Sequence, residues 1–289
     1  MSTGSVADEG GRKFQELKSA LLADITEGEY DEGALMPSQR DLAARYQVSR
    51  DTVQRVLLVL VREGWIEARQ GRGAVVLRTQ TMRSSARRYP VARRVTLGPL
   101  IASAFTARDV VLDVFTLTSE VLYTHVRAQE ELIRAREIQP TTITIRMLVP
   151  SDDLPLPFPY APDDRADDRP QERLQGIRKY HTDNLVRRLQ ELDRDIDGLR
   201  ATVEIRRVPL VPYSKLYLFN GAEVVTGPYV PSERPITLDD GTCLDVVDVM
   251  GFDSTLTHCA KDADPDSQDS LIVSSWQSWF DSTWRLLAT

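Results

Sequence analysis

The chain has 289 residues, of which 42% are hydrophobic and 27% charged, and a formal net charge of -7. This composition is ordinary for a globular protein, disfavours a disordered or fibrous chain, and leaves room for two domains of ~100 to 200 residues each. No apolar run approaches the ~18 residues that span a bilayer, and the N-terminus lacks the basic and apolar regions of a secretory signal, so a cytoplasmic protein without membrane contact is expected.

Charge is distributed unevenly along the chain. Residues 12–94 carry 16 basic and 10 acidic side chains, whereas residues 95–289 carry 20 basic and 31 acidic ones. Only the N-terminal third is therefore suited to approach phosphates. Residues 81–94 contain Arg83, Arg87, Arg88, Arg93 and Arg94, and form a basic linker. This linker is either a solvated connection or an arm that adds phosphate contacts.

The N-terminal region begins with small and acidic residues at 1–11, which predict a disordered tail. From Lys13 to Gly28, the apolar side chains Phe14, Leu17, Leu21 and Ile25 recur at helical spacing. That spacing predicts a support helix, and it opens a domain expected over residues 12–80.

The stretch Leu35–Val76 predicts two short helices, a tight turn and a hairpin. Ser38 follows Pro37 as the N-cap of the first helix. Ser49 is the N-cap of a second helix from Arg50 to Glu63, which Gly64 ends. Short strands at 67–69 and 74–77 flank a turn at Gly71–Gly73, where glycine supplies positive φ.

The second helix has one apolar and one polar side. Val53, Val56, Leu57 and Leu60 recur at the spacing of a buried face, whereas Arg50 and Gln54 project from one flank and Thr52 from the other. Polar side chains on the first two turns of such a helix can read base edges and phosphates in a major groove.

These residues resemble the GntR family of bacterial winged-helix regulators, whose pattern runs LPSER-LA, VSR-TVR-AL, EG and GRG. The resemblance covers Lys13 to about Leu77. It implies a homodimer on a two-fold symmetric double-stranded DNA operator. It also implies DNA contacts by the turn and helix residues Ser38, Arg40, Ser49, Arg50, Thr52, Gln54 and Arg55, and by the wing residues Gly71, Arg72 and Gly73. Gln54 replaces the usual arginine, which favours a contact to adenine over guanine.

Residues 95–289 predict an α/β domain. Helices are expected at 97–107, 120–137, 171–192 and 270–287, and strands at 110–116, 142–149, 201–208, 215–220, 223–230 and 243–250. Strands alternating with crossover helices predict a parallel sheet. Asn220-Gly221 predicts a tight hairpin, and residues 152–170 a long loop. Trp276, Trp279, Phe280 and Trp284 are interpreted as core or as a dimer contact.

One segment of this domain resembles a degenerate phospholipase D-like half-motif, His-x-Lys-x-x-x-x-Asp. Lys215 keeps the lysine, but Tyr213 stands in place of the histidine and Asn220 in place of the aspartate. The resemblance implies that catalysis is lost and that Tyr213, Lys215 and Asn220 belong to a ligand site in which Lys215 holds an anion. Alternatively, Lys215 is an ordinary lysine on the surface of a strand.

Other catalytic or metal sites have little support in the sequence. His125, His181 and His258 are scattered, Cys243 and Cys259 are interpreted as ordinary thiols, and no GxSxG motif occurs. We therefore expect no metal, no cofactor and no catalytic residues.

The sequence predicts a transcription regulator with a winged helix-turn-helix (α+β) domain and an α/β domain that dimerises and binds an unknown small-molecule effector. A DNA-tethered phosphodiesterase or nuclease is the alternative from another class. A third hypothesis is an architectural DNA-binding protein whose C-terminal domain is a scaffold.

Overall fold

A computed structural model of the chain describes residues 4–26, 29–62, 65–69, 73–77, 82–85, 97–238, 240–250 and 255–289. The N-terminal part is a winged helix-turn-helix. Its elements are α1 (Gly4–Thr26), α2 (Gln39–Arg45), α3 (Arg50–Arg62), β1 (Ile66–Arg69) and β2 (Gly73–Val76). The helix predicted from Lys13 begins at Gly4, so most of the expected disordered tail is helical. Extending an existing helix gains one hydrogen bond for each residue fixed, whereas starting one is costly.

The winged core lies where the helical spacing places it. Val53, Val56 and Leu60 of α3 are fully buried and pack with Leu21 of α1 and Leu42 of α2. β1 and β2 pair antiparallel from Ile66 and Val76 to Arg69 and Gly73. The predicted wing is therefore present at its base.

The C-terminal part is a mixed sheet with helices on both faces. Its elements are α4 (Leu97–Phe105), β4 (Asp109–Phe115), α5 (Glu120–Arg134), β5 (Thr142–Pro150), α6 (Arg169–Asp195), β6 (Arg200–Val208), β7 (Ser214–Phe219), β8 (Glu223–Pro228), β9 (Val230–Thr237), β10 (Cys243–Met250), β11 (Leu256–Ala260) and α7 (Gln268–Leu286). Six of these strands and β3 (Met82–Ser84) form a seven-stranded sheet in the order β3-β11-β8-β7-β4-β5-β6. The other two, β9 and β10, form a separate pair.

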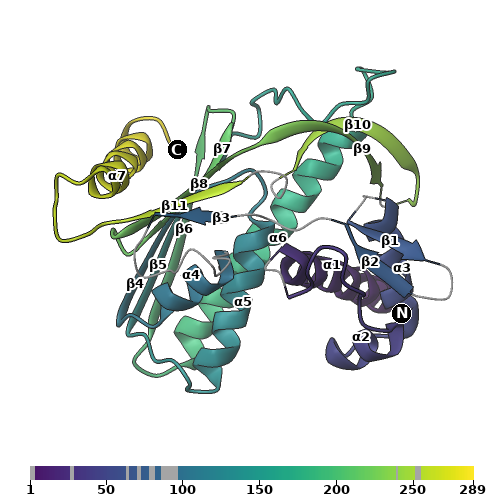
Figure 1. The fold of residues 1–289 in the computed structure, drawn as a ribbon, viewed down its shortest axis with the longest axis horizontal. Coiled ribbons are helices and arrows are strands. Elements are labelled where there is room, and N and C mark those ends of the chain that lie inside the picture. Colours follow the sequence, from purple (N-terminus) through teal and green to yellow (C-terminus); the bar gives the residue numbers. More distant parts are fainter. Residues whose placement is uncertain are drawn as a thin grey trace.

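The crossover pattern predicted from the sequence is confirmed in three of the seven strands of the sheet. β4, β5 and β6 are parallel and connected through α5 and α6, whereas β7 runs antiparallel to β4. In Figure 1, α4, α5 and α6 lie on one face of the sheet and α7 on the other. On that second face Phe280 and Trp284 are buried and belong to the core. Trp276 and Trp279 are partly buried against the same cluster, and the centroid of the Trp279 ring lies 5.4 Å from that of the Phe115 ring.

The strand predicted over 223–230 is divided in two in the structure. β8 ends at Pro228, which has no N–H to donate to a ladder, and β9 leaves the sheet after Tyr229. β9 and β10 then form a long hairpin, which in Figure 1 arches over α6 toward the winged domain. β9 contacts α3 there.

The expected linker contains a strand that belongs to the large sheet. β3 pairs in parallel with β11, Met82 is buried, and the Ser84 hydroxyl lies 2.7 Å from Nδ1 of His258. Residues 82–84 are therefore an edge strand and are not a solvated connection. The arginines at 87, 88, 93 and 94 lie outside the described residues.

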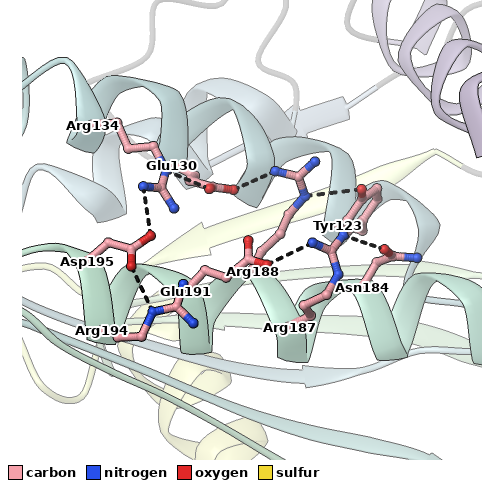
Figure 2. Close-up of polar contacts among 9 residues, drawn as sticks. All are labelled: Tyr123, Glu130, Arg134, Asn184, Arg187, Arg188, Glu191, Arg194 and Asp195. Atoms are coloured by element: carbon pink, nitrogen blue, oxygen red, sulfur yellow. Dashed lines mark hydrogen bonds and ion pairs between the residues drawn. The ribbon is translucent and has the colours of Figure 1, made fainter.

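Figure 2 shows the polar network that joins α5 to α6. Its centre is Glu130, whose carboxylate accepts from Nε of Arg134 at 2.9 Å and from Nη1 of Arg188 at 2.8 Å. Arg188 also donates to the Tyr123 hydroxyl at 3.2 Å. Burial lowers the pKa of Arg188, but the hydrogen bonds to Glu130 and Tyr123 outweigh it, so this pKa is raised. The rest of the network consists of Asn184, Arg187, Glu191, Arg194 and Asp195.

Candidate nucleic-acid interface and ligand cavity

Two side-chain caps shape the helix-turn-helix. The Ser38 hydroxyl accepts from the Asp41 amide at 3.2 Å and donates to Oδ2 of Asp41 at 2.6 Å. These bonds with Ser38 lower the pKa of Asp41. The Ser49 hydroxyl accepts from the Thr52 amide at 3.1 Å, and Gln47 takes a left-handed φ of 53° between the helices. Both predicted N-caps are therefore present, and each satisfies an amide that the helix leaves without a partner.

The exposed side of α3 carries Arg50 and Gln54, four residues apart, as its helical pattern predicts. Arg55 is half-exposed, 3.2 Å from Asp51, and its guanidinium lies 5.6 Å from the centre of the Phe14 ring. Thr52, expected on the other flank, is only 6% exposed, and its hydroxyl lies 2.9 Å from that of Ser49. Thr52 thus supports the turn.

A polar cluster that the sequence reasoning missed fixes α2 to α1. Tyr46 donates to Oδ2 of Asp24, Arg45 lies 3.3 Å from the same carboxylate, and Arg45 also donates to the Tyr30 hydroxyl at 2.8 Å. Burial, followed by the charge of Asp24, raises the pKa of Tyr46, so that its hydroxyl stays protonated and can donate. The cluster holds α2, with exposed Ser38 and Arg40, at a fixed place against the support helix.

The described residues of the wing are those at its base, in β1 and β2. Gly73 is exposed and has a φ of +94°, which explains glycine at this position. Gly71 and Arg72, the other predicted wing residues, lie outside the described residues.

The three residues of the predicted ligand site do not meet in one place. Tyr213 is 69% exposed, Lys215 is 5% exposed, and Asn220 occupies the β7–β8 turn at the other end of β7. The Asn220 amide group accepts from the Val111 amide at 2.7 Å and donates to the Ala104 carbonyl at 3.2 Å. Asn220 therefore fastens the hairpin to β4 and α4, and Lys215 is the residue of the three that lines a cavity.

That cavity has a volume of about 100 Å³ and lies at the carboxyl end of β4, between the two domains. Thr116, Leu117 and Thr118 follow β4, and Lys215, the second residue of β7, lines the cavity beside them. Lys18 and Leu22 of α1, together with Trp65, close it from the winged side. In open α/β sheets ligands bind outside the carboxyl ends of the parallel strands. The sequence did not reveal this cavity, because its lining comes from segments far apart in the chain.

A wider groove of about 1000 Å³ adjoins this cavity. Its lining residues come from α1 and α3 on one side and from α6 and the tip of the β9–β10 hairpin on the other. Lys18, Glu120, Arg173 and Ile177 line both spaces. The two spaces therefore meet at the joint between the domains.

The remaining candidate groups include His258 and the two cysteines. His258 is fully buried between Ser84 and the Glu223 carboxylate, which lies 2.8 Å from Nε2. Cys259 is buried and Cys243 exposed, both as free thiols. Within the described parts of the chain, no group of three or more histidine, cysteine, aspartate or glutamate side chains could hold a metal ion. None of the helices described there is long and apolar enough to cross a membrane.

Comparison with known proteins places the N-terminal domain in a family. Residues 13–76 match the bacterial regulatory proteins of the gntR family. The chain is 37% identical over 65 residues to the probable transcriptional regulator PhnF of Escherichia coli (strain K12), which is 22% of this chain and 27% of that protein. It is 39% identical over 63 residues to the uncharacterized HTH-type transcriptional regulator YurK of Bacillus subtilis (strain 168), 22% of this chain and 26% of YurK.

A longer match connects the chain to the HTH-type transcriptional regulator TreR of Bacillus subtilis (strain 168). It has 29% identity over 133 residues, 44% of this chain and 54% of that protein. The chain thus spans between about a quarter and half of the length of these three relatives. Residues 13–76 are a gntR-type helix-turn-helix domain, which is a DNA-binding domain.

Proposed function

We propose that the protein is a sequence-specific transcription regulator of the cytoplasm. It binds a two-fold symmetric duplex operator as a homodimer, and a small-molecule effector of the C-terminal domain modulates that binding. The observation that carries the proposal is the exposed face of α3, where Arg50 and Gln54 stand on a capped and well-packed helix within a gntR-type domain. Helices of this kind insert their first turns into a major groove.

The C-terminal domain acts in this proposal as a sensor and as the dimerisation unit, without catalysis. Its sheet is packed on both faces, and its cavity lies against the DNA-binding domain. The phosphodiesterase alternative needs the residues of the half-motif to converge on one phosphate. Tyr213 and Asn220 lie at opposite ends of β7, and Asn220 is engaged with the backbone.

The test is selection of bound duplexes from the source genome, followed by binding measurements on the selected duplex at fixed salt. Arg50→Ala should weaken binding by about 1 to 3 kcal/mol, through loss of a base or phosphate contact. If Arg50 contacts a phosphate, the slope of log K against log salt should fall by about 0.9. Arg285→Ala is the matched control, because Arg285 is an exposed arginine on α7. Equal affinity of the Arg50→Ala variant and the wild type would refute the assignment.

The identity of residue 54 tests base reading separately. Gln54→Arg should move the preference at one position of each half-site from adenine to guanine, because arginine pairs with guanine in the major groove. An unchanged consensus in the same selection would place Gln54 away from the base edges. Turnover of a bis-aryl phosphodiester, abolished by Lys215→Ala, would instead support the enzyme alternative.

A further inference from the structure

The β9–β10 hairpin connects the C-terminal domain to α3, the helix with the predicted base contacts. The hairpin is anchored in the C-terminal domain, because Ile236, Val246 and Val249 are buried. Nε of Arg173 on α6 also donates to the Thr237 carbonyl at the end of β9, at 3.0 Å. Beyond these anchors the hairpin reaches the winged domain, where β9 contacts α3 (Figure 1). The C-terminal domain therefore holds the tip of the hairpin beside α3.

The hairpin tip lies along the exposed side of α3 that carries the predicted DNA contacts. Arg55, the neighbour of Gln54, and Leu58, which is 49% exposed, line the groove of about 1000 Å³ from the α3 side. Asp240 and Gly241 line it from the hairpin side. A helix with its side chains is about 10 to 12 Å across and the major groove about 12 Å wide, so phosphates pass along both flanks of an inserted helix. The hairpin tip and one phosphate strand therefore compete for the same flank of α3.

The hairpin tip also carries a negative charge. The Asp240 carboxylate accepts from the Thr242 amide at 2.8 Å. This bond and, to a lesser degree, the positive charge of Arg169 lower the pKa of Asp240, so the exposed carboxylate is ionised at neutral pH. Arg169 is itself paired with Asp167 at 2.7 Å. Phosphates that approach this flank of α3 meet a like charge, so repulsion and steric overlap act in the same direction.

Features of the joint between the two domains favour reversible docking. Among the described residues, the apolar clusters of the two domains share no member. The Tyr180 hydroxyl and Nδ1 of His181 are buried at the groove without a hydrogen-bond partner in the described part of the chain. Burial raises the pKa of Tyr180 and lowers that of His181, and the charges of Glu16 and Lys18 on α1 add to these shifts. Both side chains thus lie near α1, and water can satisfy them only when the joint opens, which opposes docking.

We propose that the tip of the β9–β10 hairpin is an autoinhibitory element. While it lies against α3, a duplex cannot seat on that helix, and operator binding requires the winged domain to leave the hairpin. The inference rests on the proposed function, because it needs an operator that competes with the hairpin. By linkage, operator binding disfavours the docked state by the same factor by which docking weakens operator binding.

Cross-linking of the hairpin to α3 tests this exclusion. Native Cys243 is exposed on β10 opposite Thr237, whereas Cys259 is 5% exposed, and Leu58→Cys supplies a second accessible thiol on α3. A short bismaleimide should link the two thiols within one chain, and saturating operator should lower the linked fraction by about tenfold. Leu286→Cys is the matched control and should not be linked, because Leu286 is an exposed leucine on α7, on the opposite face of the sheet from α6 (Figure 1).

The linked protein should bind the operator about tenfold more weakly than the same variant treated with N-ethylmaleimide, which modifies both thiols without joining them. Asp240→Asn should raise operator affinity about fivefold at low salt, the effect of two unit charges ~4 Å apart in water, and salt should reduce this gain. Asp197→Asn is the matched control. Asp197 is an exposed aspartate just past the far end of α6, about 40 Å along that helix from Arg169.

Equal operator affinities of the linked and the N-ethylmaleimide-treated protein, or a linked fraction that saturating operator leaves unchanged, would overturn the proposal. Equal affinities of Asp240→Asn and Asp197→Asn at low salt would also overturn it, and this comparison needs no cross-link if Leu58→Cys does not fold. In each of these cases Arg50-dependent operator binding by the wild type would leave the regulator itself standing. If the wild type binds no duplex, the proposed function and the autoinhibitory hairpin both fail.

Discussion

Removal of the Glu130 carboxylate should lower the free energy of unfolding far more than removal of an exposed carboxylate on the same pair of helices, because Glu130 is buried between α5 and α6. Glu130 has a side-chain exposure of 5% and accepts from Arg134 and Arg188. In Glu130→Ala both guanidinium groups lose this partner, and Arg188, with a side-chain exposure of 20%, keeps only the Tyr123 hydroxyl and ring. Breaking a buried ion pair by removing one partner costs about 3 to 5 kcal/mol.

The expected loss lies near the lower end of that range, about 3 kcal/mol, because Arg134 is 37% exposed and retains Asp195 at 3.3 Å. Glu191→Ala is a matched control in the neighbouring helix. Glu191 pairs with Arg187 four residues earlier at 2.9 Å, and its side chain is 31% exposed. An exposed pair of this kind contributes about 0.3 to 0.5 kcal/mol. Both substitutions change glutamate to alanine inside a helix, so the difference in helix propensity cancels.

The assay is urea unfolding of both variants and the wild type, followed by circular dichroism at one pH and salt concentration. In addition, Arg188→Ala should cost less in the Glu130→Ala background than in the wild type, because it then removes a charge that lacks its partner. Equal shifts for Glu130→Ala and Glu191→Ala, or independent effects of Glu130→Ala and Arg188→Ala, would refute the reasoning from burial.

Two further variants test the turn of β7–β8 and the histidine at the domain joint. Asn220→Ala should lower the free energy of unfolding in urea by about 1 to 3 kcal/mol, because alanine loses two hydrogen bonds and adopts the left-handed φ of 51° less easily than asparagine. Asn220→Gly should restore only the part of this loss that comes from the backbone conformation. If Asn220→Gly restores the whole loss, the two hydrogen bonds do not contribute. Burial lowers the pKa of His181 below 6.5, as does Lys18, while Glu120 opposes them. His181 therefore takes up a proton at a higher pH in the unfolded chain than in the folded one, and the free energy of unfolding should fall as the pH drops below about 6.5. His181→Gln should weaken this pH dependence between about pH 7.5 and 5.5. Parallel stability curves for the variant and the wild type would contradict the expectation.

The winged domain could be predicted in detail from the sequence because its determinants are local. The caps at Ser38 and Ser49, the spacing of Val53, Val56 and Leu60, and Gly73 with its positive φ each act within a few residues. Thr52 is the instructive exception. Helical geometry places it on a flank, but its hydroxyl bonds to Ser49 and the side chain is buried, which depends on the conformation of the preceding turn.

In the C-terminal domain the crossover units could be predicted, but not the pairings between distant segments. β3 and β11 are short, and their pairing brings together residues about 170 positions apart, as Ser84 and His258 show. The cavity likewise combines Lys18, Thr116, Lys215 and Asp248. The periodicity of one segment cannot predict contacts between residues of distant segments. The prediction that Tyr213, Lys215 and Asn220 form one site did not take account of the length of β7, which separates Tyr213 before the strand from Asn220 in the turn after it.

The early edge strand β3 places a limit on how far the winged domain can travel. Five peptide steps separate Leu77, which leaves the wing, from Met82, which is fixed in the sheet. A fully extended chain of that length reaches at most about 18 Å. As long as β3 stays paired with β11, any release of α1 from α5 leaves the DNA-binding domain on a short tether. In a dimer the two tethers start from fixed points on the two sheets, so the separation of those points sets which spacings of half-sites the protein can reach.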